Sequence, residues 1–281
     1  MIRPLSWLFV PAISEKLITK GIESDADAVI FDLEDAVAKE RKADARAMLI
    51  HALQQQSPRQ LFIRINDLET EYWQDDLRAV EELVSYSLMV PKVTSAIDIQ
   101  KIEALTSRCN EIVPIIESAE GMWNVMEIAK ASPTIRQLAF GAEDYCLDLS
   151  IQKTEDGSSL LHARSQVVLA SRAAGLESPI DSVYTDFKDS DGFGKESMYH
   201  KALGFRGKLL IHPNQIEHLH SVYSVTSEEY TTAKAIKEAF EDAQQQGVAS
   251  IQVNGKMVDY PVYNQAMKMI EQYETKKAKR L

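Results

Sequence analysis

The chain has 281 residues, 45% hydrophobic and 26% charged, which is enough for one large or two small domains with a full apolar core. Its formal net charge of -11 argues against general nucleic-acid binding, although a local basic patch can still hold a polyanionic ligand. The apolar run 7–10 is too short to span a membrane. Cys109 and Cys146 show no metal or redox spacing, which fits a reducing cytoplasm.

Eight short apolar runs alternate with segments of helical periodicity. We predict strands at Ser6–Val10, Ala28–Asp32, Leu61–Arg64, Leu88–Val90, Val113–Glu117, Gln137–Phe140, Ile180–Tyr184 and Lys208–Ile211. Apolar residues between them recur every three or four positions, which predicts helices at Ile13–Ile22, Lys42–Gln55, Asp75–Val84, Ser95–Arg108, Met122–Lys130 and Leu160–Ala174. Continuous apolar strands flanked by helices indicate a parallel sheet covered on both faces.

Eight strand–helix units predict an α/β fold, a (β/α)8 TIM barrel over residues 1–225, rather than an open doubly wound sheet. No Gly-x-Gly-x-x-Gly or Walker loop follows a strand, which argues against nucleotide binding. The polar stretch Asp186–Ser197 is predicted as a loop. Residues 226–281 are predicted to be a C-terminal helical extension, a lid or an oligomer contact, with helices at Ser227–Gln246 and Val262–Lys276 and a tight turn at Asn254-Gly255.

Charged side chains follow directly on several predicted strands, namely Asp32, Glu34, Asp35, Arg64, Glu117 and Asp144. In a parallel barrel, active sites are built where strands end at their carboxyl side. Glu117 and Asp144 end the fifth and sixth strands and would be neighbours, and two carboxylates without nearby His or Cys suit Mg²⁺. The alternatives are a helix cap or an ion-pair partner, and Glu143 competes with Asp144 for the inward position.

Arg64 follows three apolar residues and therefore needs an anionic partner. Its planar guanidinium suits a substrate carboxylate or a developing oxyanion, and the alternative is a structural ion pair with Asp32, Glu34 or Asp35. We expect Glu34 and Asp35 to hold Arg64 and metal-bound waters in place, with direct acid–base work by Glu34 as the alternative.

Other basic residues offer further options. Lys92 follows the fourth strand, but the carboxylate pair favours a metal over a Schiff base there. Arg3, Lys16 and Lys20 could together hold a phosphate-bearing ligand, and the alternative is a solvated helix face.

With these residues in place, the sequence resembles the citrate lyase β-subunit-like family of the HpcH/HpaI aldolase superfamily, in particular its malyl-CoA, citramalyl-CoA and citryl-CoA lyases. The resemblance is carried in one order by WLFVPA (7–12), DAVIFDLEDAV (27–37) with Lys42 and Arg46 following, FIRIND (62–67), MVPKV (89–93), PIIES (114–118), FGAEDY (140–145), GFRGKLLIHPNQI (204–216) and GKMVDYP (255–261). The chain departs from the family pattern at its start, where Arg3-Pro4-Leu5-Ser6 precedes the first strand and Ala12 replaces a glycine.

The resemblance implies a (β/α)8 barrel that holds Mg²⁺, or Mn²⁺ in its place, on Glu117 and Asp144. It implies that Arg64 binds the carboxylate and carbonyl of a 2-oxo acid. It also implies that Asp259, in GKMVDYP, reaches the active site of a neighbouring subunit as the acid–base group.

These expectations describe a metal-dependent lyase that cleaves the CoA thioester of a 3-carboxy-3-hydroxy acid to acetyl-CoA and a 2-oxo acid. Catalysis would involve Arg64, Asp259, Glu34 and Asp35, and substrate binding would involve Arg64, Glu117, Lys16 and Lys20. The alternatives are a malyl-CoA thioesterase or synthase-like enzyme and a carrier-dependent citrate lyase β subunit. We expect a cytoplasmic homo-oligomer, a trimer or a hexamer, with no nucleic-acid or membrane partner.

Overall fold

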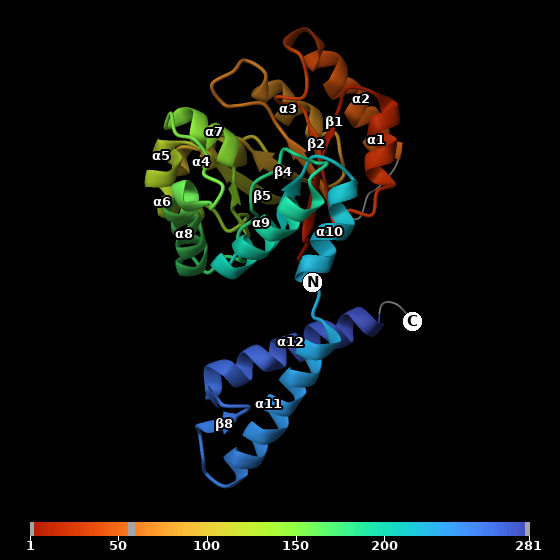
Figure 1. The fold of residues 1–281 in the computed structure, drawn as a ribbon. Coiled ribbons are helices and arrows are strands. Elements are labelled where there is room, and N and C mark those ends of the chain that lie inside the picture. Colours follow the sequence, from red (N-terminus) through yellow and green to blue (C-terminus); the bar gives the residue numbers. More distant parts are fainter. Residues whose placement is uncertain (1–2, 56–59, 279–281) are drawn as a thin grey trace. The chain divides into compact units, whose positions relative to one another are not determined.

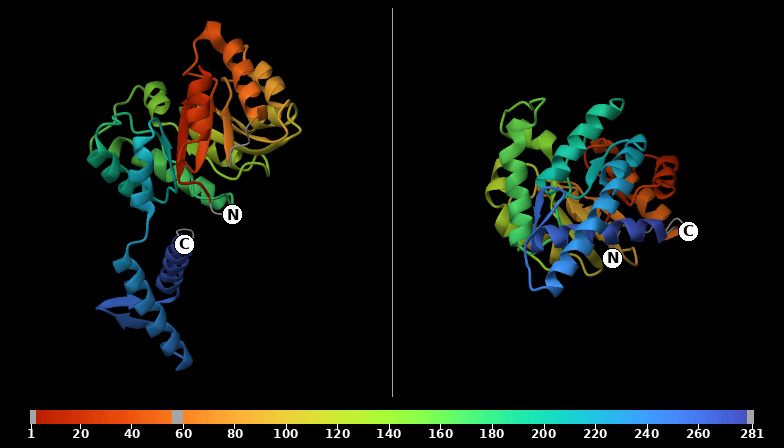
Figure 2. Two further views of the ribbon diagram at one scale, coloured as in Figure 1. Left: turned by 90° about the vertical axis from the view of Figure 1, so that its right-hand side faces the viewer. Right: turned by 60° about the horizontal axis from the view of Figure 1, so that its bottom comes forward.

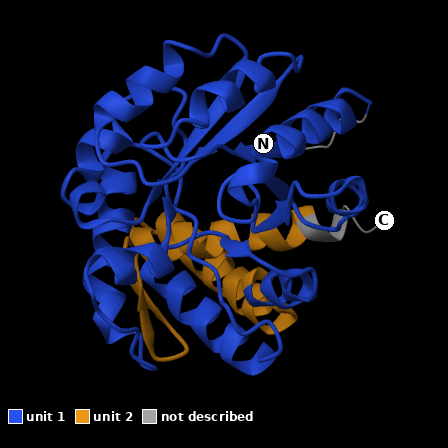
Figure 3. Cartoon of the chain, turned by 90° about the horizontal axis from the view of Figure 1, so that it is seen from above, with its two compact units in different colours: residues 1–222 blue, residues 223–281 orange. Residues whose placement is uncertain are grey.

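The chain divides into two compact units, Met1–Val222 and Tyr223–Leu281 (Figures 1 and 3). The structure is a computed structural model, and it describes residues 3–55 and 60–278. Each unit has its own apolar core.

Seven parallel strands form one sheet in the first unit, in the spatial order β6-β5-β4-β3-β2-β1-β7. Their bounds are β1 Ser6–Pro11, β2 Ala28–Asp32, β3 Leu61–Arg64, β4 Tyr86–Val90, β5 Cys109–Ile116, β6 Ala139–Phe140 and β7 Lys208–Leu210. Alternate residues along these strands, among them Trp7, Ile30, Phe62, Met89 and Val113, pack into one apolar cluster. The sheet curves into a half-barrel within an α/β fold (Figure 3).

The predicted strand Ile180–Tyr184 is not a strand in the structure. Only two isolated parallel bridges form there, from Ile180 to Ala139 of β6 and from Asp181 to Lys208 of β7. Pro179 has no N–H group to donate to a ladder, which limits the pairing of this segment on its amino side. The described residues of the first unit therefore form seven strands and this bridging segment, which does not amount to the complete eight-stranded barrel predicted from the sequence.

Helices alternate with the strands and lie on the outer side of the curved sheet (Figures 1 and 2). Their bounds are α1 Glu15–Ile22, η1 Lys39–Arg41, α2 Lys42–Gln55, α3 Trp73–Val80, α4 Ala96–Glu103, α5 Ala119–Trp123, α6 Val125–Ala129, α7 Ala142–Asp148, α8 Ser158–Ala173, α9 Ser190–Leu203 and α10 Asn214–Tyr223. The prediction of a loop at Asp186–Ser197 is wrong beyond Asp189, because the Asp189 side chain accepts a hydrogen bond from the Gly192 N–H and caps α9.

The second unit consists of α11 Ser227–Gln245, a hairpin of β8 Ile251–Val253 and β9 Lys256–Val258, and α12 Tyr260–Ala278. Asn254 and Gly255 join the two strands with φ angles of 49° and 78°, as the predicted tight turn requires. The two helices pack through a small cluster around Ala233, Ala266 and Ile270. In the described part of the chain, no helix combines the length and the apolar character needed to cross a membrane.

Candidate functional site

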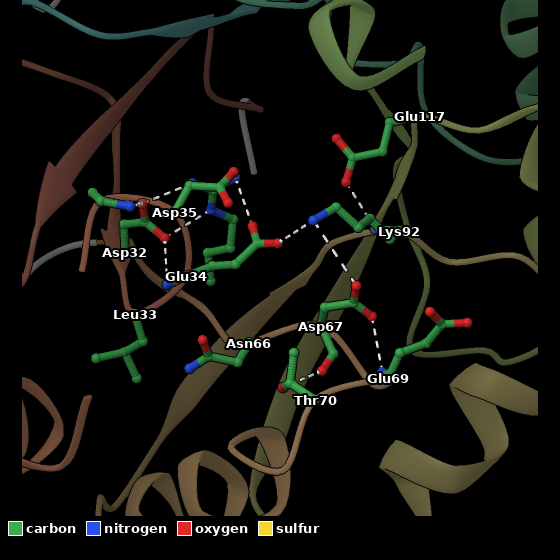
Figure 4. Close-up of polar contacts among 12 residues, drawn as sticks. Asp32, Leu33, Glu34, Asp35, Asn66, Asp67, Glu69, Thr70, Lys92 and Glu117 are labelled. Atoms are coloured by element: carbon green, nitrogen blue, oxygen red, sulfur yellow. Dashed lines mark hydrogen bonds and ion pairs between the residues drawn. The ribbon is translucent and has the colours of Figure 1, made fainter. Parts of the chain in front are cut away.

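Charged side chains meet at the carboxyl ends of β2, β3, β4 and β5 (Figure 4). Asp32 is the last residue of β2 and Arg64 the last of β3, and the sheet register places them side by side. Lys92 follows β4 by two residues, and Glu117 directly follows β5. Because parallel strands share one direction, residues from four separate stretches of sequence gather at one edge.

Arg64 is anchored by acidic side chains. Its Nε and Nη2 atoms donate to the two carboxylate oxygens of Asp32 at 2.8 Å and 2.7 Å. Its Nη1 atom lies 2.9 Å from Glu34 Oε2 and 3.6 Å from Asp35 Oδ2. Burial by itself would lower the pKa of Arg64, but the charges of Asp32 and Glu34 outweigh it and raise the pKa above its ordinary value, so the group stays charged. The ion-pair alternative of the sequence analysis is therefore present in the structure.

Glu34 lies between two cations. Besides Arg64, it contacts Lys92, whose Nζ atom donates to Glu34 Oε1 at 3.1 Å. Burial raises the pKa of Glu34 to about 7, with Arg64 and Lys92 opposing this effect and the Asp35 charge adding to it. A carboxylate with a pKa near neutrality can both accept and return a proton.

Lys92 connects Glu34 to Asp67 and Glu117, which follow β3 and β5 (Figure 4). Its Nζ atom lies 3.9 Å from Asp67 Oδ2, and its backbone N–H donates to Glu117 Oε1 at 2.8 Å. Burial lowers the pKa of Lys92, but Glu34 and the other nearby carboxylates raise it above the ordinary value. The amine therefore stays protonated near neutral pH, and imine formation is disfavoured.

Glu117 is a buried carboxylate whose side chain turns toward Lys92 (Figure 4). Burial, together with the negative charges of Asp144 and Glu34, raises the pKa of Glu117 to about 8. Gly141 makes room for it, since a Cβ atom at Gly141 would lie 2.2 Å from Glu117 Oε2. A buried carboxylate held among other carboxylates, with few cations near it, needs either a proton or a metal ion.

Asp144 lies in the first turn of α7, partly buried, and its charge acts on Glu117. The competing residue, Glu143, is exposed and paired with Lys153. Two mutually repelling carboxylates, one of them buried, match the oxygen ligands and the charge that Mg²⁺ requires. The residues present therefore fit a hard divalent cation.

We expect Gly141→Ala to lower both Mg²⁺ affinity and stability. The added Cβ would collide with Glu117 Oε2, so either this carboxylate or the start of α7 must shift, at a cost of ~1–3 kcal/mol. Calorimetric Mg²⁺ titration and urea unfolding measure the two effects. Gly194→Ala in α9 is the matched control, because nothing lies within 4 Å of its added Cβ, and an equal loss in both variants would refute the steric argument.

The other predicted site residues are Arg3, Lys16, Lys20 and Asp259. Lys16 and Lys20 are exposed on α1, whereas Arg3 is paired with Glu111 at 2.8 Å. Asp259 belongs to the second unit, where its Oδ1 atom accepts from the Val262 N–H at 3.3 Å at the start of α12. This contact is that of a capping aspartate before α12, and the role of Asp259 at a neighbouring subunit stays a prediction.

A buried charged cluster around Asp181 was not predicted from the sequence. This carboxylate accepts from Arg164 Nε at 3.1 Å and is bonded to His200 Nδ1 at 2.7 Å and to Lys208 Nζ. Asp181, Glu196 and His200 have the mutual spacing of metal ligands, but the Lys208 ammonium already bridges Asp181 and Glu196. The cluster is therefore a structural ion-pair network. A lysine that opens an apolar strand was the signal available in the sequence.

We expect Asp181→Asn to lower the free energy of unfolding by about 3–5 kcal/mol, because the buried Arg164 would lose its anionic partner and the buried Lys208 would keep only Glu196 of its two carboxylates. Burial raises the pKa of Asp181, but Lys208, His200 and Arg164 lower it well below 3.8. The contribution is thus fully present above about pH 5 and is lost as the pH falls toward the depressed folded-state pKa.

Urea unfolding at pH 7 and pH 3 measures this difference. The gap between wild type and Asp181→Asn should narrow at pH 3. Asp44→Asn is the control, since its carboxylate is exposed and paired with the exposed Arg41, and its effect should stay within ~0.5 kcal/mol. A gap that does not change with pH would contradict the assignment.

A model of the HpcH/HpaI aldolase/citrate lyase family matches residues 5–213. The chain belongs to this family. The match covers all seven strands of the half-barrel and the whole charged site, so the family resemblance inferred from the sequence is confirmed.

Similar members of the HpcH/HpaI family are enzymes of two kinds. The chain is 37% identical to the citrate lyase subunit beta of Escherichia coli (strain K12), over 96% of this chain and 93% of that one. It is 35% identical to a (3S)-malyl-CoA thioesterase of Cereibacter sphaeroides (strain ATCC 17029 / ATH 2.4.9), over 90% and 89%. A crystal structure of protein CitE from Mycobacterium tuberculosis in complex with magnesium, acetoacetate and coenzyme A matches at 30% identity with a TM-score of 0.84, covering 96% and 98%.

Proposed function

We propose that this protein is a Mg²⁺-dependent carbon–carbon lyase that cleaves a 3-carboxy-3-hydroxyacyl-CoA, of the citramalyl-, malyl- or citryl-CoA type, to acetyl-CoA and a 2-oxo acid. The observation that carries the proposal is the buried Glu117, whose pKa is raised by burial and by Asp144, next to the Arg64 network. Glu117 and Asp144 would hold the ion. A Mg²⁺ ion bound there would act as a Lewis acid and template for the substrate carboxylate and its neighbouring oxygen.

The side chains supply the rest of the mechanism. Glu34, with its pKa near 7, takes the hydroxyl proton of the substrate. The adjacent carbon–carbon bond then breaks, the former hydroxyl oxygen becomes a carbonyl oxygen, and the bonding electron pair passes to the thioester as an enolate. Arg64 stabilises the oxygen that carries the developing charge, while Asp32 and Asp35 hold Arg64 in place. Asp259 of a neighbouring subunit protonates the enolate carbon and completes acetyl-CoA.

Two further features belong to the same proposal. The bridging segment at Ile180 and Asp181 would take the place of an eighth strand and close the half-barrel between β6 and β7. Lys16 and Lys20 would contact CoA phosphates, and a homotrimer or homohexamer would bring Asp259 to the site.

Hydrolysis is the second candidate function, favoured by the similarity to a (3S)-malyl-CoA thioesterase. A third candidate is a carrier-dependent subunit, favoured by the similarity to citrate lyase subunit beta. A thioesterase would release free CoA. A carrier-dependent subunit would be inactive on CoA thioesters by itself and would need an acyl-carrier partner.

The test is an assay of the purified protein on malyl-CoA, citramalyl-CoA and citryl-CoA, with Mg²⁺ and then with EDTA. Acetyl-CoA and free CoA are followed separately. Metal-dependent acetyl-CoA release supports the lyase, and free CoA without acetyl-CoA selects the thioesterase. A folded protein that binds Mg²⁺ but acts on none of the three would refute a lyase acting alone on these substrates.

A further inference from the structure

Lys42 is a buried lysine in a costly position. It is the first residue of α2, and the residue as a whole is only 7% exposed. A positive charge at the amino end of a helix opposes the helix dipole. Burial also lowers the pKa of Lys42, although nearby carboxylates such as Asp32 and Asp76 oppose this shift. Packing alone does not account for an ammonium group here, because an apolar side chain of the same length would avoid both costs.

The Lys42 ammonium is bonded to the backbone that carries the site. Its Nζ atom donates to Leu33 O at 2.8 Å and to Glu34 O at 2.7 Å. Leu33 and Glu34 begin the loop after β2, and Figure 4 shows them beside Asp32 and Asp35. Both residues are buried, so without Lys42 water could replace the lost donor only by entering the core.

We propose that Lys42 is a positioning residue for the active site. By holding the Leu33 and Glu34 carbonyl groups, it fixes the backbone from which the Glu34 side chain reaches Arg64 and Lys92. Asp32 restrains the same loop, because it accepts from the Glu34 N–H at 2.9 Å and the Ala36 N–H at 3.1 Å. Two backbone bonds add to this, from the Leu33 N–H to Arg64 O at 3.0 Å and from the Val37 N–H to Glu34 O at 2.9 Å. Lys42 adds a side-chain donor to the Leu33 and Glu34 carbonyl groups.

The next turn of α2 supports the same arrangement for the neighbouring loop. Arg46, four residues after Lys42, donates to Asp76 Oδ1 at 2.8 Å. Asp76 Oδ2 in turn accepts from the backbone N–H of Asn66 at 2.8 Å and from its side-chain Nδ2 at 2.7 Å. The two basic residues thus lie on one face of α2 and restrain the loops after β2 and β3, respectively.

Hydrogen exchange tests the structural half of the inference without any substrate. Lys42→Met keeps the side-chain length and removes the charge and the donors. In Lys42→Met we expect faster hydrogen exchange in peptides covering residues 31–38 than in wild type, with a smaller change at residues 61–70. In Arg46→Met we expect the larger increase at residues 61–70 and the smaller one at residues 31–38. The matched control is Lys39→Met, which removes an exposed lysine three residues earlier and should leave both peptides unchanged. Unchanged exchange at 31–38 in Lys42→Met would overturn the inference.

Kinetics test the functional half, which rests on the proposed function. Misplacement of a catalytic group by ~1 Å can cost about 100-fold in rate, so we expect Lys42→Met to lose kcat on that scale with KM little changed. Lys42→Ala should recover part of its kcat when ethylammonium is added, because the small cation can occupy the vacated space. A proportional rise in KM with unchanged kcat, or no loss relative to Lys39→Met, would refute the positioning role.

Failure of the proposed function and failure of the positioning role of Lys42 give different experimental results. If the wild-type protein cleaves none of the thioesters, the proposed function fails, and the exchange data still decide whether Lys42 holds the loop. Should Lys42→Met fail to fold, as judged by its thermal unfolding, the Lys42→Ala variant refolded with and without ethylammonium provides the same comparison. Absence of any ethylammonium effect on exchange at 31–38 would then overturn the inference.

Discussion

Asp144→Asn is expected to lower kcat at least ~10³-fold with little change in stability, because several kcal/mol of transition-state stabilisation depend on the metal site. Asp144 is partly exposed, and its negative charge raises the pKa of the buried Glu117. Removing that charge relieves repulsion in the metal-free protein, so the fold should not suffer. Loss of a residue that merely supports a metal ligand lowers metal affinity by about 10- to 100-fold. Loss of the ligand Asp144 itself should therefore lower Mg²⁺ affinity by at least this factor.

Calorimetric titration with Mg²⁺ and steady-state kinetics measure the two effects of Asp144→Asn. The control is Glu143→Gln, since Glu143 is the adjacent acidic residue, exposed and paired with Lys153. It should keep both metal affinity and rate. Full activity of Asp144→Asn with Mg²⁺ still bound would exclude Asp144 as a ligand, and loss of binding in Glu143→Gln alone would assign the site to the neighbouring residue.

Arg64→Lys is expected to be nearly as damaging as complete removal of the charge. The guanidinium binds both oxygens of Asp32 and also lies next to Glu34, whereas a lysine ammonium cannot reproduce this planar fork. Asp32 and Glu34 are both buried, and in Arg64→Lys their carboxylates would lose hydrogen bonds to the guanidinium. This loss should lower the free energy of unfolding by about 3–5 kcal/mol. A loss of ~10²–10³-fold in kcat is expected as well, the range measured when one oxyanion donor is removed.

Urea unfolding and kinetics separate these two effects of Arg64→Lys. Arg78→Lys provides the matched change on the surface, because Arg78 is exposed and bonded to Asp75 at 2.7 Å. Its stability should stay within ~0.5 kcal/mol of wild type. If Arg64→Lys unfolds like the control and keeps its rate, Arg64 serves neither as structural anchor nor as substrate contact.

Several strands were predictable because their signal is local. Runs such as Ala28–Asp32 and Leu61–Arg64 are continuous in apolar residues, and their observed bounds agree with the prediction. The tight turn at Asn254 and Gly255 was predictable for a similar reason, since positive φ angles favour these two residue types. The predicted strand Ile180–Tyr184 carries a weaker signal, because Asp181 and Ser182 interrupt its apolar residues, and only isolated bridges form there.

Charged residues at strand ends were also visible in the sequence, but their contacts were not. The pairing of Asp32 with Arg64 follows from the register between β2 and β3, and that of Glu34 with Lys92 from the path of two loops. The room that Gly141 leaves for Glu117 likewise depends on the approach of two chain segments.

The sequence by itself determined the family, the apolar strands and the kinds of charged groups available, because these depend on residue type and short-range order. Tertiary structure decided which charges are buried and which of them meet. Asp181 and Lys208 lie 27 residues apart and Arg3 and Glu111 lie 108 apart, yet both pairs form ion pairs. Burial then sets the pKa values of Glu34 and Glu117, since desolvation exists only once the chain has folded around the carboxylates.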